Sequence, residues 1–206
     1  MGDDNVFLGT YAGGETTRIG SDNVAIGHNA LDSNTTGANN IAIGVAAMDG
    51  STGASANYAI GNYTMRNLTT GTANYAFGQN ALQNLTTGNR NVAIGKNALY
   101  TGTVTHDNVV IGEQAGYALT DGNAYYNIAI GSYALDAAST SHSNTCIGYG
   151  AASQLETGNG NTCIGGGRGV DDGQDIVAGQ SGGSGGGAVS YTHLRAHETV
   201  LDLVCR

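Results

Sequence analysis

The chain has 206 residues, no Pro, 35 Gly and only 11% charged residues, whereas an ordinary soluble domain carries about a quarter charged residues. This composition argues against an ordinary enzyme domain. The formal net charge is -9, and the seven Lys and Arg residues are scattered, so they form no basic patch of the kind that binds nucleic acid. No apolar run approaches the length that spans a bilayer, so membrane insertion is not expected.

A five-residue phrase of Asn, small or branched apolar residues and Gly returns ten times between residues 5 and 165. Successive glycines of the phrase are separated by 18, 17, 17, 17, 17, 17, 19, 17 and 17 residues. A period this constant is typical of a solenoid, in which each repeat forms one coil stacked on the previous coil. These glycines are Gly9, Gly27, Gly44, Gly61, Gly78, Gly95, Gly112, Gly131, Gly148 and Gly165.

The phrase has the alternation of a short strand. In the copy that begins at Asn23, Val24 and Ile26 share one face and Ala25 takes the other. We expect the Ile face to line the interior of the coil, and the Ala face to be a smooth outer surface on which chains pack closely. The predicted core column is Ile26, Ile43, Ile60, Phe77, Ile94, Ile111, Ile130, Ile147 and Ile164.

A second apolar column, four residues beyond each Gly, predicts the opposite wall of the core. It contains Leu31, Met48, Met65, Leu82, Leu99 and Leu135, with Gly116 and Ala152 in two copies. The turn phrase Thr-Thr-Gly follows, as in Thr35 to Gly37, and is expected to drift out of phase after Thr103. Because each unit is rich in Gly, Asn and β-branched residues, a helix is disfavoured. The sequence therefore predicts an all-β fold, a parallel β-solenoid of about ten 17-residue coils.

Stacking of these coils predicts a ladder of the leading Asn residues, whose side-chain amides can bond along the stack. The predicted ladder contains Asn23, Asn40, Asn57, Asn74, Asn91, Asn108, Asn127, Asn144 and Asn161. In the small-residue column, Cys146 and Cys163 lie one repeat apart. We expect two small buried thiols there, because in-register parallel strands strain a disulfide between them.

No catalytic or metal constellation is expected. His28, His106 and His142 fall in different columns, and the acidic residues stand alone, so we predict no enzyme activity, no metal site and no cofactor. The surface tyrosines are better candidates for function. Tyr125 and Tyr126, assigned to the one two-residue insertion, are the predicted ligand contacts, because exposed aromatic rings can stack on sugars. Residues directly after each Gly, where copies differ most, are expected to accompany them.

Three segments are predicted. Residues 1–170 form the repeat solenoid, residues 171–188 a Gly-rich flexible linker, and residues 189–206 a tail of different character. That tail resembles a segment found on unrelated metagenome-derived translations, which implies adapter read-through and a non-native origin. Neither terminus has the features of a solenoid cap, so the chain is expected to be a piece of a longer protein.

The phrases N-V-A-I-G-H-N-A-L and S-N-T-T-G resemble the repeats in the shafts of phage tail fibres and related bacterial tail-fibre-domain proteins. The N-V-A-I-G core is also similar to the head repeat of YadA-like trimeric autotransporter adhesins. The resemblance implies a trimer of parallel β-rolls on the outside of a virion or a cell, in which neighbouring chains cover the second apolar face of the strands.

These observations lead to a functional hypothesis. The chain is expected to be a structural or adhesive segment of a phage tail fibre, a homotrimer on the virion tail that presents or spaces a receptor-binding region. The rival hypothesis is a bacterial surface adhesin head that binds matrix or a cell-surface glycan. An ice-binding solenoid and a small enzyme are minor alternatives, and the sequence does not choose between phage and bacterial origin.

Overall fold

The computed structural model describes residues 4–14, 20–120 and 122–165, which form an all-β rod. Ten parallel strands make one sheet in sequence order, which confirms the predicted parallel β-solenoid. The linker expected at 171–188 and the tail expected at 189–206 lie outside the described residues. The strands are β1 (Val6–Leu8), β2 (Val24–Ile26), β3 (Ile41–Ile43), β4 (Tyr58–Ile60), β5 (Tyr75–Phe77), β6 (Val92–Ile94), β7 (Val109–Ile111), β8 (Ile128–Ile130), β9 (Thr145–Ile147) and β10 (Thr162–Ile164).

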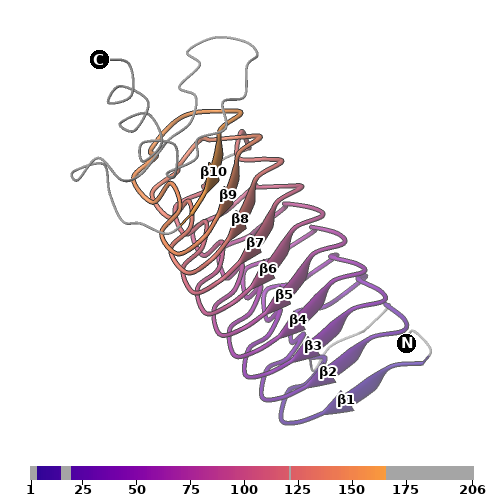
Figure 1. Cartoon of the computed structure of the whole chain (residues 1–206). Helices are drawn as coiled ribbons and strands as arrows, with labels where there is room; N and C mark the ends of the chain where they lie inside the picture. Colours follow the sequence, from indigo (N-terminus) through magenta and orange to yellow (C-terminus); the bar gives the residue numbers. More distant parts are fainter. Residues whose placement is uncertain (1–3, 15–19, 121, 166–206) are drawn as a thin grey trace, which may run out of the picture.

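Equivalent residues of successive coils stack directly. Ala25 pairs with Ala42, and Ala42 pairs with Ala59. The register also survives the longer repeat, since Val110 pairs with Ala129. Figure 1 shows the coils stacked as a rod, with β1 and β10 at opposite ends. Each three-residue strand is too short to be stable alone, so the stacking is what stabilises it.

The prediction that the Ile face lines the interior is wrong, and the two faces of the strands are exchanged. The Ala column is fully buried, with Ala25, Ala59 and Ala93 at 0% exposure, whereas Ile60 is 37% and Ile94 is 39% exposed. Alternation places Ile and Ala on opposite faces but does not say which face is inward. The residues wrongly assigned to the core, all on the outer face of the sheet, are Ile26, Ile43, Ile60, Phe77, Ile94, Ile111, Ile130, Ile147 and Ile164.

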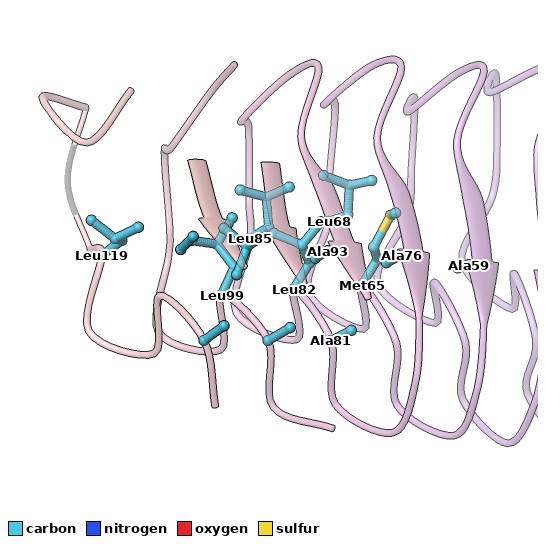
Figure 2. Close-up of a cluster of buried hydrophobic side chains, with 14 of the residues drawn as sticks. Ala59, Met65, Leu68, Ala76, Ala81, Leu82, Leu85, Ala93, Leu99 and Leu119 are labelled. Carbon is cyan, nitrogen blue, oxygen red and sulfur yellow. The ribbon is translucent and has the colours of Figure 1, made fainter. Parts of the chain in front are cut away.

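The reason for the inversion lies in the other walls of the coil. The column four residues beyond each Gly is buried as predicted, and Leu31, Met65 and Leu99 are at 0% exposure. A third wall, missed from the sequence, comes from the turn segment, where Leu68 and Leu85 are equally buried. Figure 2 shows both sets of large side chains converging on the small Ala76 and Ala93 of the sheet. Because these two walls supply large residues, the inward column of the sheet wall is mostly Ala or Cys. Its larger members are Val110, which is at 0% exposure, and Phe7 in the first strand, which packs partly buried against the core.

The corners of the coil use left-handed backbone even where the residue is not Gly. Ala46, Met48 and Ala56 have φ of 51°, 53° and 57°, and equivalent residues in the other coils repeat these values. An L-residue in this region costs about 1–2 kcal/mol. The Gly that follows each strand is required because the next coil passes too close for a side chain. A Cβ on Gly27 would clash with the carbonyl oxygen of Gly44.

The exchanged faces generate a test of which column is inside. Ala93→Leu is expected to lower the free energy of unfolding by about 1–3 kcal/mol, because a filled interior resists overpacking. Its matched control, Ile94→Leu, changes the shape of the adjacent outward side chain and is expected to cost less than about 0.5 kcal/mol. Urea unfolding followed by circular dichroism measures both. A larger loss for Ile94→Leu than for Ala93→Leu would restore the Ile face to the interior.

Candidate ligand-contact surface

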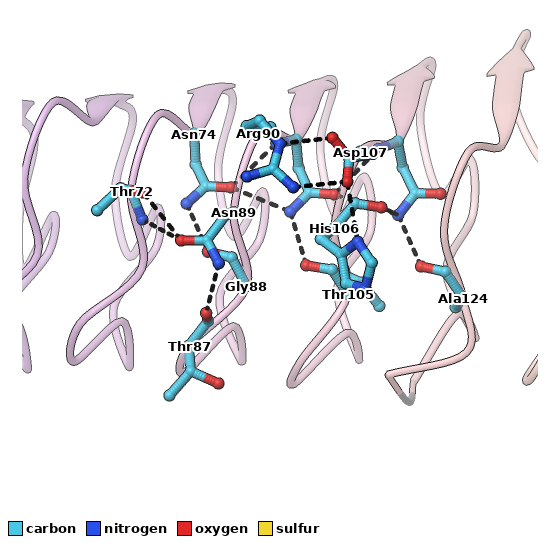
Figure 3. A network of polar contacts seen from close by, with 12 residues as sticks. Thr72, Asn74, Thr87, Gly88, Asn89, Arg90, Thr105, His106, Asp107 and Ala124 are labelled. Atoms are coloured by element: carbon cyan, nitrogen blue, oxygen red, sulfur yellow. Dashed lines mark hydrogen bonds and ion pairs between the residues drawn. The ribbon is translucent and has the colours of Figure 1, made fainter.

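The corner that precedes each strand is built on the Asn ladder, which the structure confirms. The backbone N–H and the side-chain Nδ2 of Asn40 both donate to Oδ1 of Asn23, at 3.0 and 3.1 Å. A further Nδ2 hydrogen bond, 2.8 Å long, reaches the carbonyl oxygen of Ala54 in the following coil. The same pattern recurs along the ladder, and Figure 3 shows it around Asn74, Gly88 and Thr105. One side chain thus holds parts of three successive coils together.

A second ladder, formed by hydroxyl groups, runs along the turn corner. The Oγ1 of Thr35 donates to the carbonyl oxygen of Thr52, at 2.8 Å. The series continues through Thr103, whose hydroxyl donates to Thr120, so the predicted loss of phase after Thr103 is wrong. Each hydroxyl proton is used within the rod, so these hydroxyls stabilise the coil. The donors are Thr35, Thr52, Thr69, Thr86, Thr103, Thr120 and Ser139.

Two residues before the ladder Asn, three aromatic side chains form a stack across successive coils. The rings of His106 and Tyr125 are parallel within 6° with centroids 5.3 Å apart. Those of Tyr125 and His142 are parallel within 2° with centroids 4.8 Å apart. Both faces of the Tyr125 ring are therefore covered by imidazoles. The equivalent positions of the coils before and after carry Asn89 and Asn159.

Beside this stack lies a small charged group. Arg90 binds the carboxylate of Asp107 with two hydrogen bonds, 2.6 and 2.9 Å long, and Nδ1 of His106 lies 2.9 Å from the same carboxylate. The hydrogen bond from Arg90 is the main reason that the pKa of Asp107 falls to about 2, and the contact with His106 lowers it further against the opposing effect of burial. Asp107 is thus an anion throughout the physiological range, and Figure 3 shows it between the two partners.

The two tyrosines predicted as ligand contacts have different roles. Tyr125 forms a parallel bridge with His106, so it belongs to the regular coil, and the extra residues fall before Ala124. The assignment of Tyr125 and Tyr126 to the insertion is therefore wrong. Tyr126 is 60% exposed, and its ring meets the edge of Tyr125 at 89°. Tyr126 can still present a ring to a ligand, whereas Tyr125 cannot offer a free face.

The variable column after each Gly does stack as predicted. The backbone N–H of Asn97 donates to the carbonyl of Gln79, and that of Gln114 to the carbonyl of Lys96. Its side chains include His28, Asn62, Gln79, Lys96, Glu113 and Tyr149. Of these, Tyr149 is 54% exposed and packs edge-on against Tyr133 with centroids 5.8 Å apart. This column follows the Gly corner, and the Tyr126 corner precedes the strands, so the sequence places the two at opposite ends of each strand.

No group of three or more His, Cys, Asp or Glu side chains that could hold a metal occurs among the described residues. Cys146 and Cys163 are buried thiols that are not joined by a disulfide, as expected from the sequence. Contact with the Cys163 thiol, together with burial, raises the pKa of Cys146, so this sulfur remains a protonated, unreactive thiol. The polar chemistry of the described surface is that of aromatic rings, amides and two ion-paired groups, Arg66 with Asp49 and Arg90 with Asp107.

Comparison with known proteins returns no match among family models, curated proteins or solved structures. Within the described ranges we also find no helix with the length and apolarity needed to cross a bilayer.

The Asn ladder generates a prediction about stability. Asn74→Ala removes the acceptor for two donors of Asn91 and the donor to the carbonyl of Gly88. Since a buried polar group left unpaired costs about 1–3 kcal/mol, we expect a loss on the order of 3 kcal/mol in thermal or urea unfolding. Asn67→Ala is the matched control, because its amide makes one exposed contact with Asn84. Equal losses for the two variants would contradict the ladder's role.

The aromatic stack generates a second prediction. Tyr125→Ala removes the stacked contacts with two imidazoles and the edge contact with Tyr126, each worth about 0.5–1.5 kcal/mol, and should destabilise the rod measurably. Tyr126→Ala removes an exposed ring and should change the free energy of unfolding by less than about 0.5 kcal/mol. Thermal unfolding of the two single variants separates the roles. Identical melting temperatures for both variants and the wild type would show that the stack contributes nothing.

Proposed function

We propose that this chain is a rigid shaft segment of a homotrimeric fibre, a phage tail fibre, that spaces or presents a receptor-binding region outside the cell. The observation that carries the proposal is the uninterrupted stack of ten strands in one sheet. At a strand spacing of about 4.8 Å, such a stack spans roughly 45 Å. Almost all the specific interactions of the described chain serve the stack itself.

Two features support a mechanical role. The Asn ladder and the Thr ladder connect each coil to the next through side chains as well as backbone. A rod whose neighbouring coils are joined in three places resists bending and local opening better than a sheet held by backbone bonds alone. This stiffness suits a spacer that must keep its distal part at a set distance, on a virion tail or a bacterial surface.

The second candidate is a bacterial adhesin head that binds a glycan or a protein receptor, and one observation favours it. Tyr126 is 60% exposed and occupies the position that Arg90 and Asp107 hold in the two preceding coils, directly before the ladder Asn. An exposed ring next to fixed charged hydrogen-bonding groups is a combination that can hold a sugar. The contact would involve one corner of one coil, so it fits a weak single-site interaction, and the shaft remains the first proposal.

Binding to bacterial cells and to an immobilised glycan array distinguishes the two functions. The full chain is compared with Tyr126→Ala, and Tyr63→Ala serves as the control because Tyr63 is also exposed but lies on another side of the coil. A shaft segment is expected to bind neither cells nor glycans. Saturable binding that is lost in Tyr126→Ala and retained in Tyr63→Ala would overturn the spacer in favour of the adhesin.

A further inference from the structure

The outer face of the ten-stranded sheet is an apolar surface that no described part of the chain covers. Each strand directs its first and third side chains outward, and these form two continuous columns along the rod. Among them Val6, Leu8 and Ile164 are 55%, 66% and 66% exposed, while Tyr58 and Ile128 are 39% and 38% exposed. We call these two columns the sheet face.

The sheet face carries no charge although the chain has a net charge of -9. Its twenty side chains are aliphatic or aromatic except for two Thr at the end of the rod. They are Val6, Leu8, Val24, Ile26, Ile41, Ile43, Tyr58, Ile60, Tyr75, Phe77, Val92, Ile94, Val109, Ile111, Ile128, Ile130, Thr145, Ile147, Thr162 and Ile164. An acidic protein that keeps one whole face free of charge can bring that face against a like surface without juxtaposing carboxylates.

The size of the sheet face is that of an interface. Ten strands about 4.8 Å apart and three residues wide give a projected footprint of roughly 450–480 Å². Protruding side chains expose more accessible area than this projection, which brings the face near the ~800 Å² per partner that a standard interface buries. Soluble monomers rarely expose a contiguous apolar patch above a few hundred Å².

From these observations we infer that the sheet face is the surface through which copies of this chain pack on one another. The repeat itself selects the partner. Ridges of Ile and Val recur at every coil, so only a surface with the same spacing over ten coils can interdigitate along its whole length, and a second copy has that spacing. The inference rests on the proposed homotrimer, and it replaces the Ala face expected from the sequence, which is buried inside each coil.

Sedimentation velocity of the full chain tests the inference. The wild type is expected to sediment as an assembly, and the double variant Ile60→Asp with Ile94→Asp as a monomer, with at least a tenfold weaker association. Val104→Asp is the matched control, because Val104 is 43% exposed but belongs to the turn corner; it should leave the assembly intact. A monomeric wild type, or an assembly that the double variant does not weaken, would overturn the inference.

A cross-linking experiment keeps the test decisive if the double variant fails to fold. In a chain with Cys205→Ser, Ile94→Cys is expected to form an interchain disulfide under a mild disulfide oxidant, whereas Val104→Cys is not. Equal cross-linking at both positions, or none at Ile94→Cys, would also overturn the inference. The cell-binding experiment measures function independently of assembly. A monomeric chain that binds no cells would contradict only this inference, and an assembled chain that binds cells through Tyr126 would contradict only the spacer function.

Discussion

In-register stacking of one coil on the next is the constraint on which the rest of this structure depends. Once Ala25 lies over Ala42, every other residue of the coil must also lie over its counterpart. Identical side chains then meet at a fixed spacing, which allows an amide to bond to an amide and a hydroxyl to a carbonyl. The stacking also offsets the left-handed corners, whose strain recurs in each coil. A single coil has none of these compensations and would not hold its shape.

The sequence was sufficient to predict the fold and the Asn ladder, because both follow from period alone. A constant repeat determines which residues stack, and Asn is the residue whose side chain can donate and accept along a stack. The recurring Thr-Thr-Gly turn was predicted, but the ladder of hydroxyl hydrogen bonds between coils was not. The insertion before Ala124 separates Thr120 from Ser139 by 19 residues, and the structure shows that Ser139 remains in line with Thr120.

Which strand face is inward could not be predicted from alternation. The expectation that the larger apolar residue of a strand faces the interior is wrong here, because side chains from three walls share the interior volume. Leu82 and Leu85, from the other two walls of the coil that begins with β5, are fully buried in one cluster with Ala76, which leaves no room for an inward Phe77. The clue was present in the turn phrase Asn-Leu-Thr, whose Leu recurs at Leu68 and Leu85. Counting the large residues of all three walls would have placed the Ala column inside.

The candidate contact surface was predicted less well than the fold, for a physical reason. Columns that pack are repetitive and can be recognised, whereas a contact surface consists of departures from the repeat. Those departures concentrate at one corner, where Arg90, Asp107 and Tyr126 succeed the small Ala56 and Ala73 of earlier coils. Their neighbours, such as the imidazoles that cover Tyr125, depend on ring orientation, which no sequence period encodes.

The surface of the rod thus contains a uniform part, the sheet face, and a variable part, the corner that carries Tyr126. The sheet face is uniform because its strands share one register and one alternation, and uniformity suits contact with another uniform rod. The residue at the Tyr126 corner can vary between coils. Its left-handed backbone is fixed by the hydrogen bond from the Asn127 backbone N–H to Oδ1 of Asn108, and the exposed side chain does not contribute to that bond. A change there alters the surface of one coil and leaves the stack intact. The proposed assembly surface and the proposed contact corner therefore lie in different columns of the same repeat and share no residues.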